Sequence, residues 1–222
     1  MLHTTLLSVE NIARRQQDKV ISLLSERGMA RLSEFIKEGV TATAVSRMAR
    51  SGQLVQLSRG LYQLPDAPLD ANHSLAEAAK RVPKGVICLD SALAFHELTD
   101  RTSRYIWMAI GVREWRPRIT NPPIQIMRFG PKVLETGIET HLIENVSVRI
   151  YSPAKTIADL FYHAHRQQRR YGSKVGLTHA LQGMKEALRR RKATPADIAR
   201  YSVEAGIWKK VQPYLEALTV DA

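Results

Sequence analysis

The sequence predicts a mixed α/β (α+β) protein with an N-terminal winged helix-turn-helix, a second mixed α/β domain and a helical C-terminal tail. Three observations predict this. Residues 1–65 read as helix, helix, turn, helix and two-stranded ribbon, which is the order of a winged helix. Strand-like and helix-like segments mix between residues 73 and 155, and helical spacing dominates after that. The segment PDAPLDAN holds two prolines and two aspartates, so we expect domains at 1–65 and 73–222 joined by a linker at 66–72.

The first domain is expected to contain three helices and a hairpin. A long helix over 8–27 ends at Gly28, and Ser33 can cap a short second helix, SEFIKE. Thr41 is a good N-cap for a third helix that ends near Gly52. The segments LVQL and LYQL then flank Ser-Arg-Gly, and a three-residue connection ending in glycine is typical of a hairpin.

The third helix is expected to read DNA with its polar face. At 100° per residue, Val45, Met48 and Ala49 share one face with Thr41, and the polar residues share the other. Arginine binds guanine edges or phosphates, and small hydroxyls contact DNA without blocking close approach. The predicted DNA-binding residues are Thr43, Ser46, Arg47 and Arg50 on the helix and Arg59 at the hairpin tip. The alternative is that the winged helix docks a protein, with its arginines merely solvated.

The second domain is expected to mix strands and helices. Ser74 and Glu77 have the spacing of a capping box for a helix that ends before Pro83, and Asp90 or Ser91 can cap a helix over 90–98. The expected strands lie at 86–89, 105–111, 124–130 and 146–151.

A further helix is expected to start at Ser152, with Pro153 in its first position. Its apolar stripe is Ile157, Leu160, Phe161 and Ala164. Lys155 and Asp159 lie four residues apart on this helix. They are interpreted as an intrahelical ion pair worth a few tenths of a kcal/mol; the alternative is a charged pair exposed for a partner or a phosphate.

We expect no catalytic, metal or cofactor site. Phosphate-binding and dinucleotide-binding glycine motifs are lacking, and the histidines do not have zinc-ligand spacing. Cys88 lies in an apolar segment and is expected to be a small core residue. Asp90, Glu97 and Asp100 are interpreted as cap and helix-surface groups, which argues against a metal-dependent nuclease.

The charge favours a polyanionic partner. The chain of 222 residues has a net charge of +12 and a sequence pI near 10.1. Residues 156–222 carry half of that net charge, so the tail is predicted to form a second basic surface that meets nucleic acid; the alternative is a solvated charged face. Its residues are Arg166, Arg169, Arg170, Arg189, Arg190, Arg191 and Lys192. The sequence contains neither a secretory signal pattern nor an apolar run long enough to span a membrane, so we expect a cytoplasmic protein.

Three segments in order resemble the AbiEi family of antitoxins from type IV toxin–antitoxin systems. They are LSRGLYQLP at 57–65, GVICLDSALAFHEL at 85–98 and YSPAKTIADLF at 151–161. The helical tail is similar to the end of the same family. The resemblance implies a winged helix that binds inverted repeats in the promoter of its own operon and represses it. It also implies an antitoxin domain that counteracts an AbiEii-like nucleotidyltransferase toxin without a stable complex.

Carried over to this chain, the DNA-reading positions implied by the resemblance are the five named above; no catalytic residues are implied. Two alternatives stay open. One is an orphan winged-helix transcription regulator whose C-terminal domain senses a small molecule. The other is a nuclease or nucleotide-handling enzyme that the winged helix targets to DNA.

Overall fold

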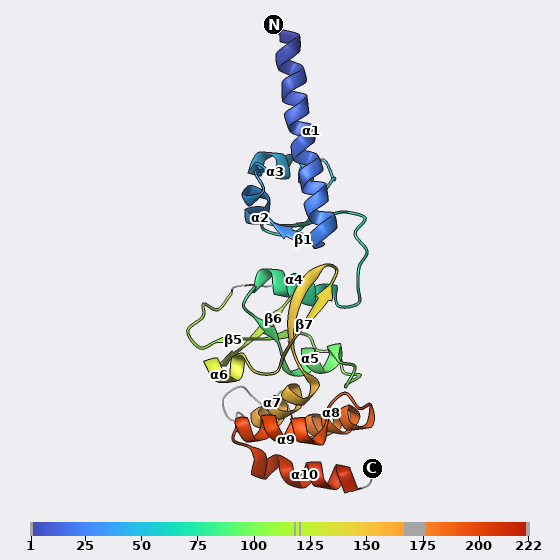
Figure 1. Ribbon diagram of the computed structural model, residues 1–222, viewed down its shortest axis with the longest axis vertical. Coiled ribbons are helices and arrows are strands. Elements are labelled where there is room, and N and C mark those ends of the chain that lie inside the picture. The colour runs from blue at the N-terminus through green and yellow to red at the C-terminus, as the bar shows by residue number, and fades with distance from the viewer. Residues whose placement is uncertain (1, 118, 120, 167–175, 221–222) are drawn as a thin grey trace. The chain divides into compact units, whose positions relative to one another are not determined.

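The computed structural model describes residues 2–117, 119, 121–166 and 176–220 (Figure 1). The chain forms two compact units. The first comprises Met1–Arg81 and Leu142–Ser147, and the second comprises Val82–His141 and Val148–Ala222. The mixed α/β class predicted from the sequence is confirmed, because the first unit combines helices with a small sheet and the second combines a larger sheet with helices.

The first unit has the element order of a winged helix. Its elements are α1 (Leu2–Arg27), β1 (Met29–Arg31), α2 (Leu32–Lys37), α3 (Ala42–Arg50), β2 (Val55–Ser58), β3 (Leu61–Gln63) and α4 (His73–Arg81). β3 is the central strand of a three-stranded sheet, in which it pairs antiparallel with both β1 and β2. The predicted third helix and hairpin are therefore confirmed.

Three details of this unit differ from the prediction. Strand β1 was not predicted. Ser33 does not cap the second helix: α2 starts at Leu32, and the backbone N–H of Arg31 donates to the Glu34 carboxylate at 2.8 Å. The capping box at Ser74 is also wrong, because α4 starts at His73 and Glu77 instead accepts a hydrogen bond of 2.6 Å from Arg81.

Apolar side chains from α1, α2, α3 and the sheet form the core of the first unit. Its buried residues are Val20, Leu23, Leu24, Ala30, Phe35, Val40, Ala44, Val45, Met48, Leu54 and Tyr62. The inner face of α3 contributes Val45 and Met48, which leaves the opposite face of that helix to solvent.

The second unit is built on a five-stranded mixed sheet of order β6-β5-β4-β8-β7. The strands are β4 (Val86–Ile87), β5 (Ile106–Gly111), β6 (Ile124–Phe129), β7 (Ile138–Ile143) and β8 (Val146–Tyr151). β4 pairs antiparallel with β5 and parallel with β8, and β5 pairs parallel with β6.

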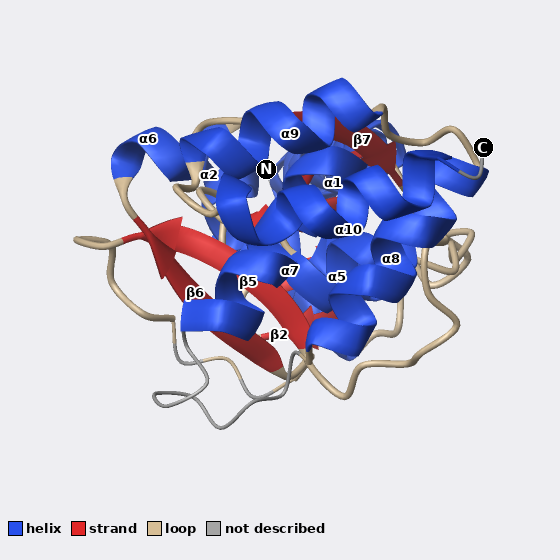
Figure 2. Cartoon of the chain, turned by 90° about the horizontal axis from the view of Figure 1, so that it is seen from below, coloured by secondary structure: helices blue, strands red, loops and turns tan. Residues whose placement is uncertain are grey.

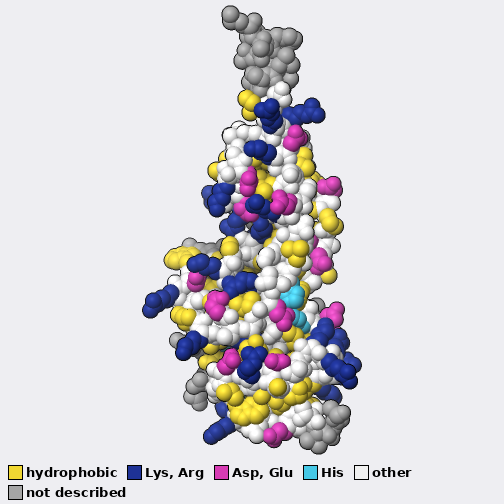
Figure 3. Space-filling model, in the orientation of Figure 1, with side chains coloured by type: hydrophobic (Ala, Val, Ile, Leu, Met, Phe, Trp, Pro, Cys, Tyr) yellow, Lys and Arg dark blue, Asp and Glu magenta, His cyan; other side chains and the backbone are white. Residues whose placement is uncertain are grey.

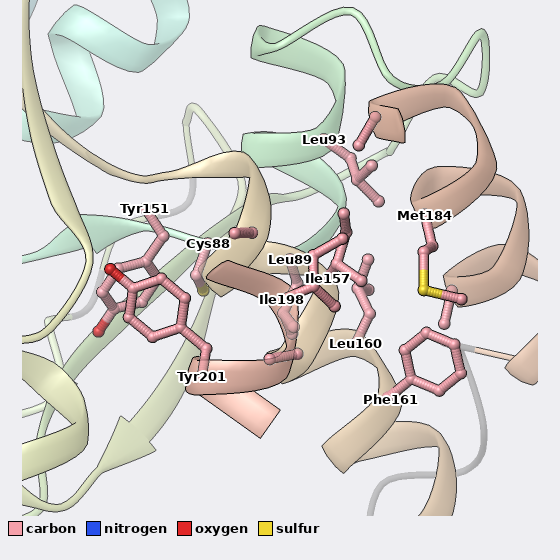
Figure 4. Close-up of a cluster of buried hydrophobic side chains, with 14 of the residues drawn as sticks. Cys88, Leu89, Leu93, Tyr151, Ile157, Leu160, Phe161, Met184, Ile198 and Tyr201 are labelled. Atoms are coloured by element: carbon pink, nitrogen blue, oxygen red, sulfur yellow. The ribbon is translucent and has the colours of Figure 1, made fainter. Parts of the chain in front are cut away.

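The helices of this unit pack on the sheet or on one another. They are α5 (Leu89–Phe95), α6 (Pro131–Leu134), α7 (Pro153–Arg166), α8 (Leu177–Arg189), α9 (Pro195–Glu204) and α10 (Trp208–Val220). Figure 1 shows α7 between the strands and helices α8 and α9, with α10 outermost, and Figure 2 shows α7 beside β5, with α5 and α8 on its other side. Ile157, Leu160 and Phe161 of α7 meet Met184 of α8 and Ile198 of α9 in the core (Figure 4). This confirms the predicted apolar stripe of α7.

The strand predicted at 86–89 is shorter than expected, because the chain turns sharply at Leu89, whose φ is 47°. The N-cap of α5 is therefore Cys88, and neither Asp90 nor Ser91 caps it. The Ser91 hydroxyl instead accepts a hydrogen bond of 2.9 Å from the backbone N–H of Trp107. Strand β7 and helix α6 were not predicted. Among the described residues, no helix is long and apolar enough to cross a membrane.

Candidate nucleic-acid interface

Helix α3 is anchored at its start by two side chains. The Thr41 hydroxyl accepts a hydrogen bond of 3.3 Å from the backbone N–H of Ala44, as predicted for an N-cap. The same hydroxyl donates to the side-chain oxygen of Gln16 on α1 at 2.9 Å, and that oxygen also lies 3.3 Å from the Thr41 backbone N–H. Gln16 was not identified from the sequence, because a polar residue on a long helix gives no sign of its distant partner.

The outward face of α3 holds four of the predicted DNA-binding residues together. Thr43, Arg47 and Arg50 are exposed, and Ser46 is half-buried. One guanidinium nitrogen of Arg50 donates to the Ser46 hydroxyl at 3.1 Å, so these two side chains are held side by side. Arg47 lines a shallow surface hollow of about 290 Å³ between α3 and α1. The spacing of these four residues predicted a common face, and the structure places them on one.

The wing is the β2–β3 hairpin. Gly60 has a φ of 74°, and its carbonyl accepts a hydrogen bond of 2.8 Å from Leu32. The positive φ at the last residue of the connection explains why glycine stands there. Arg59 lies at the exposed tip of the hairpin, as predicted.

The positive charges of this face are not neutralised locally. Within the described part of the chain, none of Arg47, Arg50 and Arg59 lies within 4.0 Å of a carboxylate oxygen. The acidic residues of α2 and of its C-cap are paired with other cations: Glu34 pairs with Lys80 at 3.1 Å, and Glu38 pairs with Arg27 at 3.3 Å. Guanidinium groups without a protein counter-ion are available to phosphates or guanine edges.

The predicted basic surface of the tail differs in this respect. Glu186 pairs with Arg189 at 2.6 Å and with Arg190 at 3.2 Å. Lys192 donates to the Glu97 carboxylate at 3.0 Å and to the His96 carbonyl at 2.7 Å. Hydrogen bonds from these cations hold the pKa values of both carboxyls below their usual range.

Arg191 is exposed and without an ion pair among the described residues. Arg169 and Arg170 lie outside the described residues, and so does the side chain of Arg166. The described part of this surface is therefore largely charge-compensated. Figure 3 likewise shows acidic side chains interspersed with Lys and Arg over the visible face.

The Lys155–Asp159 pair is intrahelical, as predicted, and the alternative of a pair exposed for a partner or a phosphate is wrong, because both side chains are buried. Nζ of Lys155 lies 2.5 Å from Oδ1 of Asp159, and each side chain is 4% exposed. The ammonium also lies 4.7 Å from the ring centroid of Tyr151 and 5.3 Å from that of Phe129. Burial raises the pKa of the Asp159 carboxyl.

Several titratable groups of the second unit are buried. Cys88 is fully buried, and burial raises the pKa of its thiol well above the usual range. His163 is buried next to the Phe129 ring, and burial lowers its pKa to about 4. Nδ1 of His179 lies 3.0 Å from the Asp90 carboxylate, so this aspartate has a structural role as the partner of a buried histidine. In the described residues, no three His, Cys, Asp or Glu side chains are grouped to hold a metal ion.

Comparison with known proteins supports the interpretation of the N-terminal unit. Residues 18–65 match the family model described as "Transcriptional regulator, AbiEi antitoxin". The match covers the last part of α1 and all of β1, α2, α3, β2 and β3. The AbiEi resemblance is thus confirmed for this region; the segments 85–98 and 151–161 lie outside the matched residues.

The fold of the whole chain is similar to a solved structure. The crystal structure of the RV2827C protein from Mycobacterium tuberculosis superposes with a TM-score of 0.54 at 12% sequence identity. The superposition covers 91% of this chain and 81% of the other. No curated protein sequence matches the chain.

Proposed function

We propose that the N-terminal unit binds double-stranded DNA, with α3 in the major groove and the wing on the backbone or in the minor groove. The observation that carries this proposal is the pair of exposed, unneutralised arginines on α3, whose opposite face is packed into the core. A winged helix uses its third helix and its hairpin tip in this way.

The side chains of α3 and the wing are proposed to contact different parts of the DNA. Arg47 and Arg50 have the bidentate geometry to bind guanine O6 and N7 or a phosphate. Thr43 is small enough to let the helix backbone approach the bases. Arg59 at the wing tip is suited to the phosphate backbone, where it contributes affinity rather than sequence selectivity.

We further propose that the chain is a non-enzymatic cytoplasmic antitoxin of a type IV pair that represses its own operon through inverted repeats. It would counteract a nucleotidyltransferase toxin without forming a stable complex with it. The family match over 18–65 supports this, as does a second unit with its own core that is large enough for a separate role. The domain arrangement proposed is a winged helix at 1–65, a linker at 66–72 and an antitoxin domain at 73–222.

The DNA-binding proposal is tested by gel-shift titration with the duplex immediately upstream of the gene, at two salt concentrations. Arg47→Ala and Arg50→Ala are each expected to weaken binding by about 1–3 kcal/mol if the side chain contacts a base. If the contact is to phosphate, the slope of log affinity against log salt is expected to fall by about 0.9. Lys37→Ala is the matched control, because Lys37 is an exposed cation of α2 outside the proposed face.

Equal binding of the wild type and both arginine variants would refute the proposal, and so would equal affinity for random duplex. The first result would leave α3 without a role in DNA binding. The second would reduce the winged helix to a non-specific anchor.

The antitoxin half is tested by co-expressing the chain with the toxin encoded next to it and measuring growth. The Arg47→Ala/Arg50→Ala variant is expected to restore growth while failing to repress, because neutralisation is assigned to the second unit. Failure of the wild type to restore growth would refute the antitoxin assignment.

A ligand-sensing regulator is the second candidate, because the second unit contains a hollow of about 380 Å³. Lys132, Val133, Thr136, Lys155, Tyr201, Glu204 and Ala205 line it. That volume lies within the range of small-molecule sites. The growth experiment separates the two candidates, since a sensor would leave the toxicity of the neighbouring gene unchanged.

A further inference from the structure

An exposed tryptophan marks the connection between β5 and β6. Trp115 is 81% exposed, which is the largest exposed fraction among the large hydrophobic side chains of the described residues. The other two tryptophans differ: Trp107 is 7% exposed, and Trp208 packs partly against the core. Tryptophan is enriched at surfaces where proteins bind partners, and it is among the residues that contribute most to binding there.

The start of this connection is held in place by Arg128 of β6. One of its guanidinium nitrogens lies 2.7 Å from the carbonyl oxygen of Val112, 2.9 Å from that of Glu114 and 3.3 Å from that of Gly111. The Glu114 side chain also accepts from Lys84 at 3.1 Å. These hydrogen bonds attach the backbone just before Trp115 to strand β6. The exposed indole therefore follows a stretch of backbone that is held in place.

The surroundings of the indole are basic and concave. A surface hollow of about 620 Å³ is lined by Arg113, Glu114, Trp115, Arg116, Pro117, Ile119, Ile124 and Arg128. Arg113 and Arg116 are exposed, and neither is within 4.0 Å of a carboxylate oxygen of the described residues. Since Glu114 is already paired with Lys84, the surface retains the unneutralised positive charge of the two arginines that flank Trp115 in the sequence.

We infer that this surface binds single-stranded nucleic acid, with a base stacked on Trp115 and phosphates at Arg113 and Arg116. An indole face with adjacent guanidinium groups suits this ligand, because every unpaired base has a π-face and every nucleotide a phosphate. In a duplex the base faces are covered by their neighbours, so an exposed indole has no equivalent partner there. An acidic peptide would pair with the arginines but would leave the indole face unused.

This inference is independent of duplex binding by α3, because it involves residues of the second unit alone. It gives the second unit a nucleic-acid ligand of a different kind from that of the winged helix.

The test is a titration of the full chain with labelled single-stranded RNA and DNA oligonucleotides, followed by anisotropy and by tryptophan fluorescence. Trp115→Ala is expected to weaken binding by roughly 5- to 150-fold, the range that corresponds to loss of one stacked base. Trp115→Phe is expected to weaken binding less, because it keeps an aromatic face, and to abolish most of the fluorescence quenching. Both variants are expected to keep the wild-type circular dichroism spectrum, since the side chain is exposed.

The charge contribution is tested with Arg113→Ala/Arg116→Ala. Loss of two phosphate contacts is expected to lower the salt slope by about 1.4 for a single strand. Lys185→Ala/Lys209→Ala is the control, because it removes two exposed cations of the same unit away from the hollow. It is expected to keep both the affinity and the quenching.

Three results would overturn the inference. The first is single-strand affinity that does not change in Trp115→Ala. The second is a loss of single-strand binding in Arg47→Ala/Arg50→Ala, which would assign that binding to α3. The third is quenching of Trp115 by acidic peptides but not by oligonucleotides, which would assign the surface to a protein partner. A failure of duplex binding alone would leave the inference intact.

Discussion

The buried ion pair of α7 makes the sharpest prediction about stability. Asp159→Asn keeps the size of the side chain but leaves the Lys155 ammonium without its counter-ion in a site that is 4% exposed. Removing one partner of a buried pair costs about 3–5 kcal/mol. The rings of Tyr151 and Phe129 lie within cation–π distance of the ammonium and offset part of the loss, so we expect about 3 kcal/mol.

The double variant Lys155→Met/Asp159→Leu should behave differently. It removes both charges together with their desolvation penalties, and apolar replacements of buried pairs are often neutral or stabilising. We expect its free energy of unfolding to lie within about 1 kcal/mol of the wild type or above it.

The assay is urea unfolding followed by tryptophan fluorescence. Trp107, Trp115 and Trp208 all lie in the second unit, so the signal reports the unit that contains the pair. Arg189→Ala is the control: it removes an ion pair of 2.6 Å whose side chains are 60% and 31% exposed, and we expect it to leave the urea midpoint nearly unchanged. If Asp159→Asn costs less than about 1 kcal/mol, the pair is not desolvated in the folded protein and the reasoning is refuted.

Three further predictions concern other positions. Thr41→Ala removes the cap of α3 and should cost about 0.5–2 kcal/mol, measured as faster hydrogen exchange of the α3 amides; unchanged exchange would contradict the capping role. His163 has a folded pKa of about 4, below its ordinary value of 6.5, so the unfolded chain binds more protons between these pH values and stability falls as the pH is lowered through this window. The loss at pH 5 relative to pH 8 should be about 2 kcal/mol, and His163→Leu should remove it from urea-unfolding curves; a pH dependence identical to that of the wild type would contradict this assignment. Gly137→Ala should destabilise the second unit by about 2 kcal/mol or more in thermal unfolding, because φ is 70° and the new Cβ would lie 2.7 Å from Cβ of Lys155; an unchanged midpoint would show that the loop relaxes freely.

Elements with a strong local signal could be predicted from the sequence. The Thr41 cap, the polar face of α3 and the glycine that ends the hairpin connection are set by residues close in the chain. Strand β1 has only three residues, too few to show alternation, and its existence depends on pairing with β3. Strand β7 exposes Leu142 at 73%, so its apolar residues do not follow the alternation that predicts a strand.

The burial of polar side chains was the main feature that could not be predicted from the sequence. Lys155 and Asp159 were predicted to form an intrahelical ion pair worth only a few tenths of a kcal/mol, because charges four residues apart on a helix are usually solvated. Helices α5, α8 and α9 all pack on α7, so that even its polar side is enclosed. Long-range contacts were also beyond prediction at the candidate nucleic-acid interface. The residue spacing predicted the polar face of α3, but not the hydrogen bond between Thr41 and Gln16 of α1.

The strand order of the two sheets has a consequence for synthesis on the ribosome. All three strands of the first sheet, and helices α1 to α3, come from residues 2–63, so this subdomain has its partners once that stretch has emerged. The central strand β4 pairs through Ile87 with Ile150 of β8. The larger sheet therefore cannot form completely until that much later part of the chain has been synthesised. The winged helix is thus available to fold while the rest of the polypeptide is still being made.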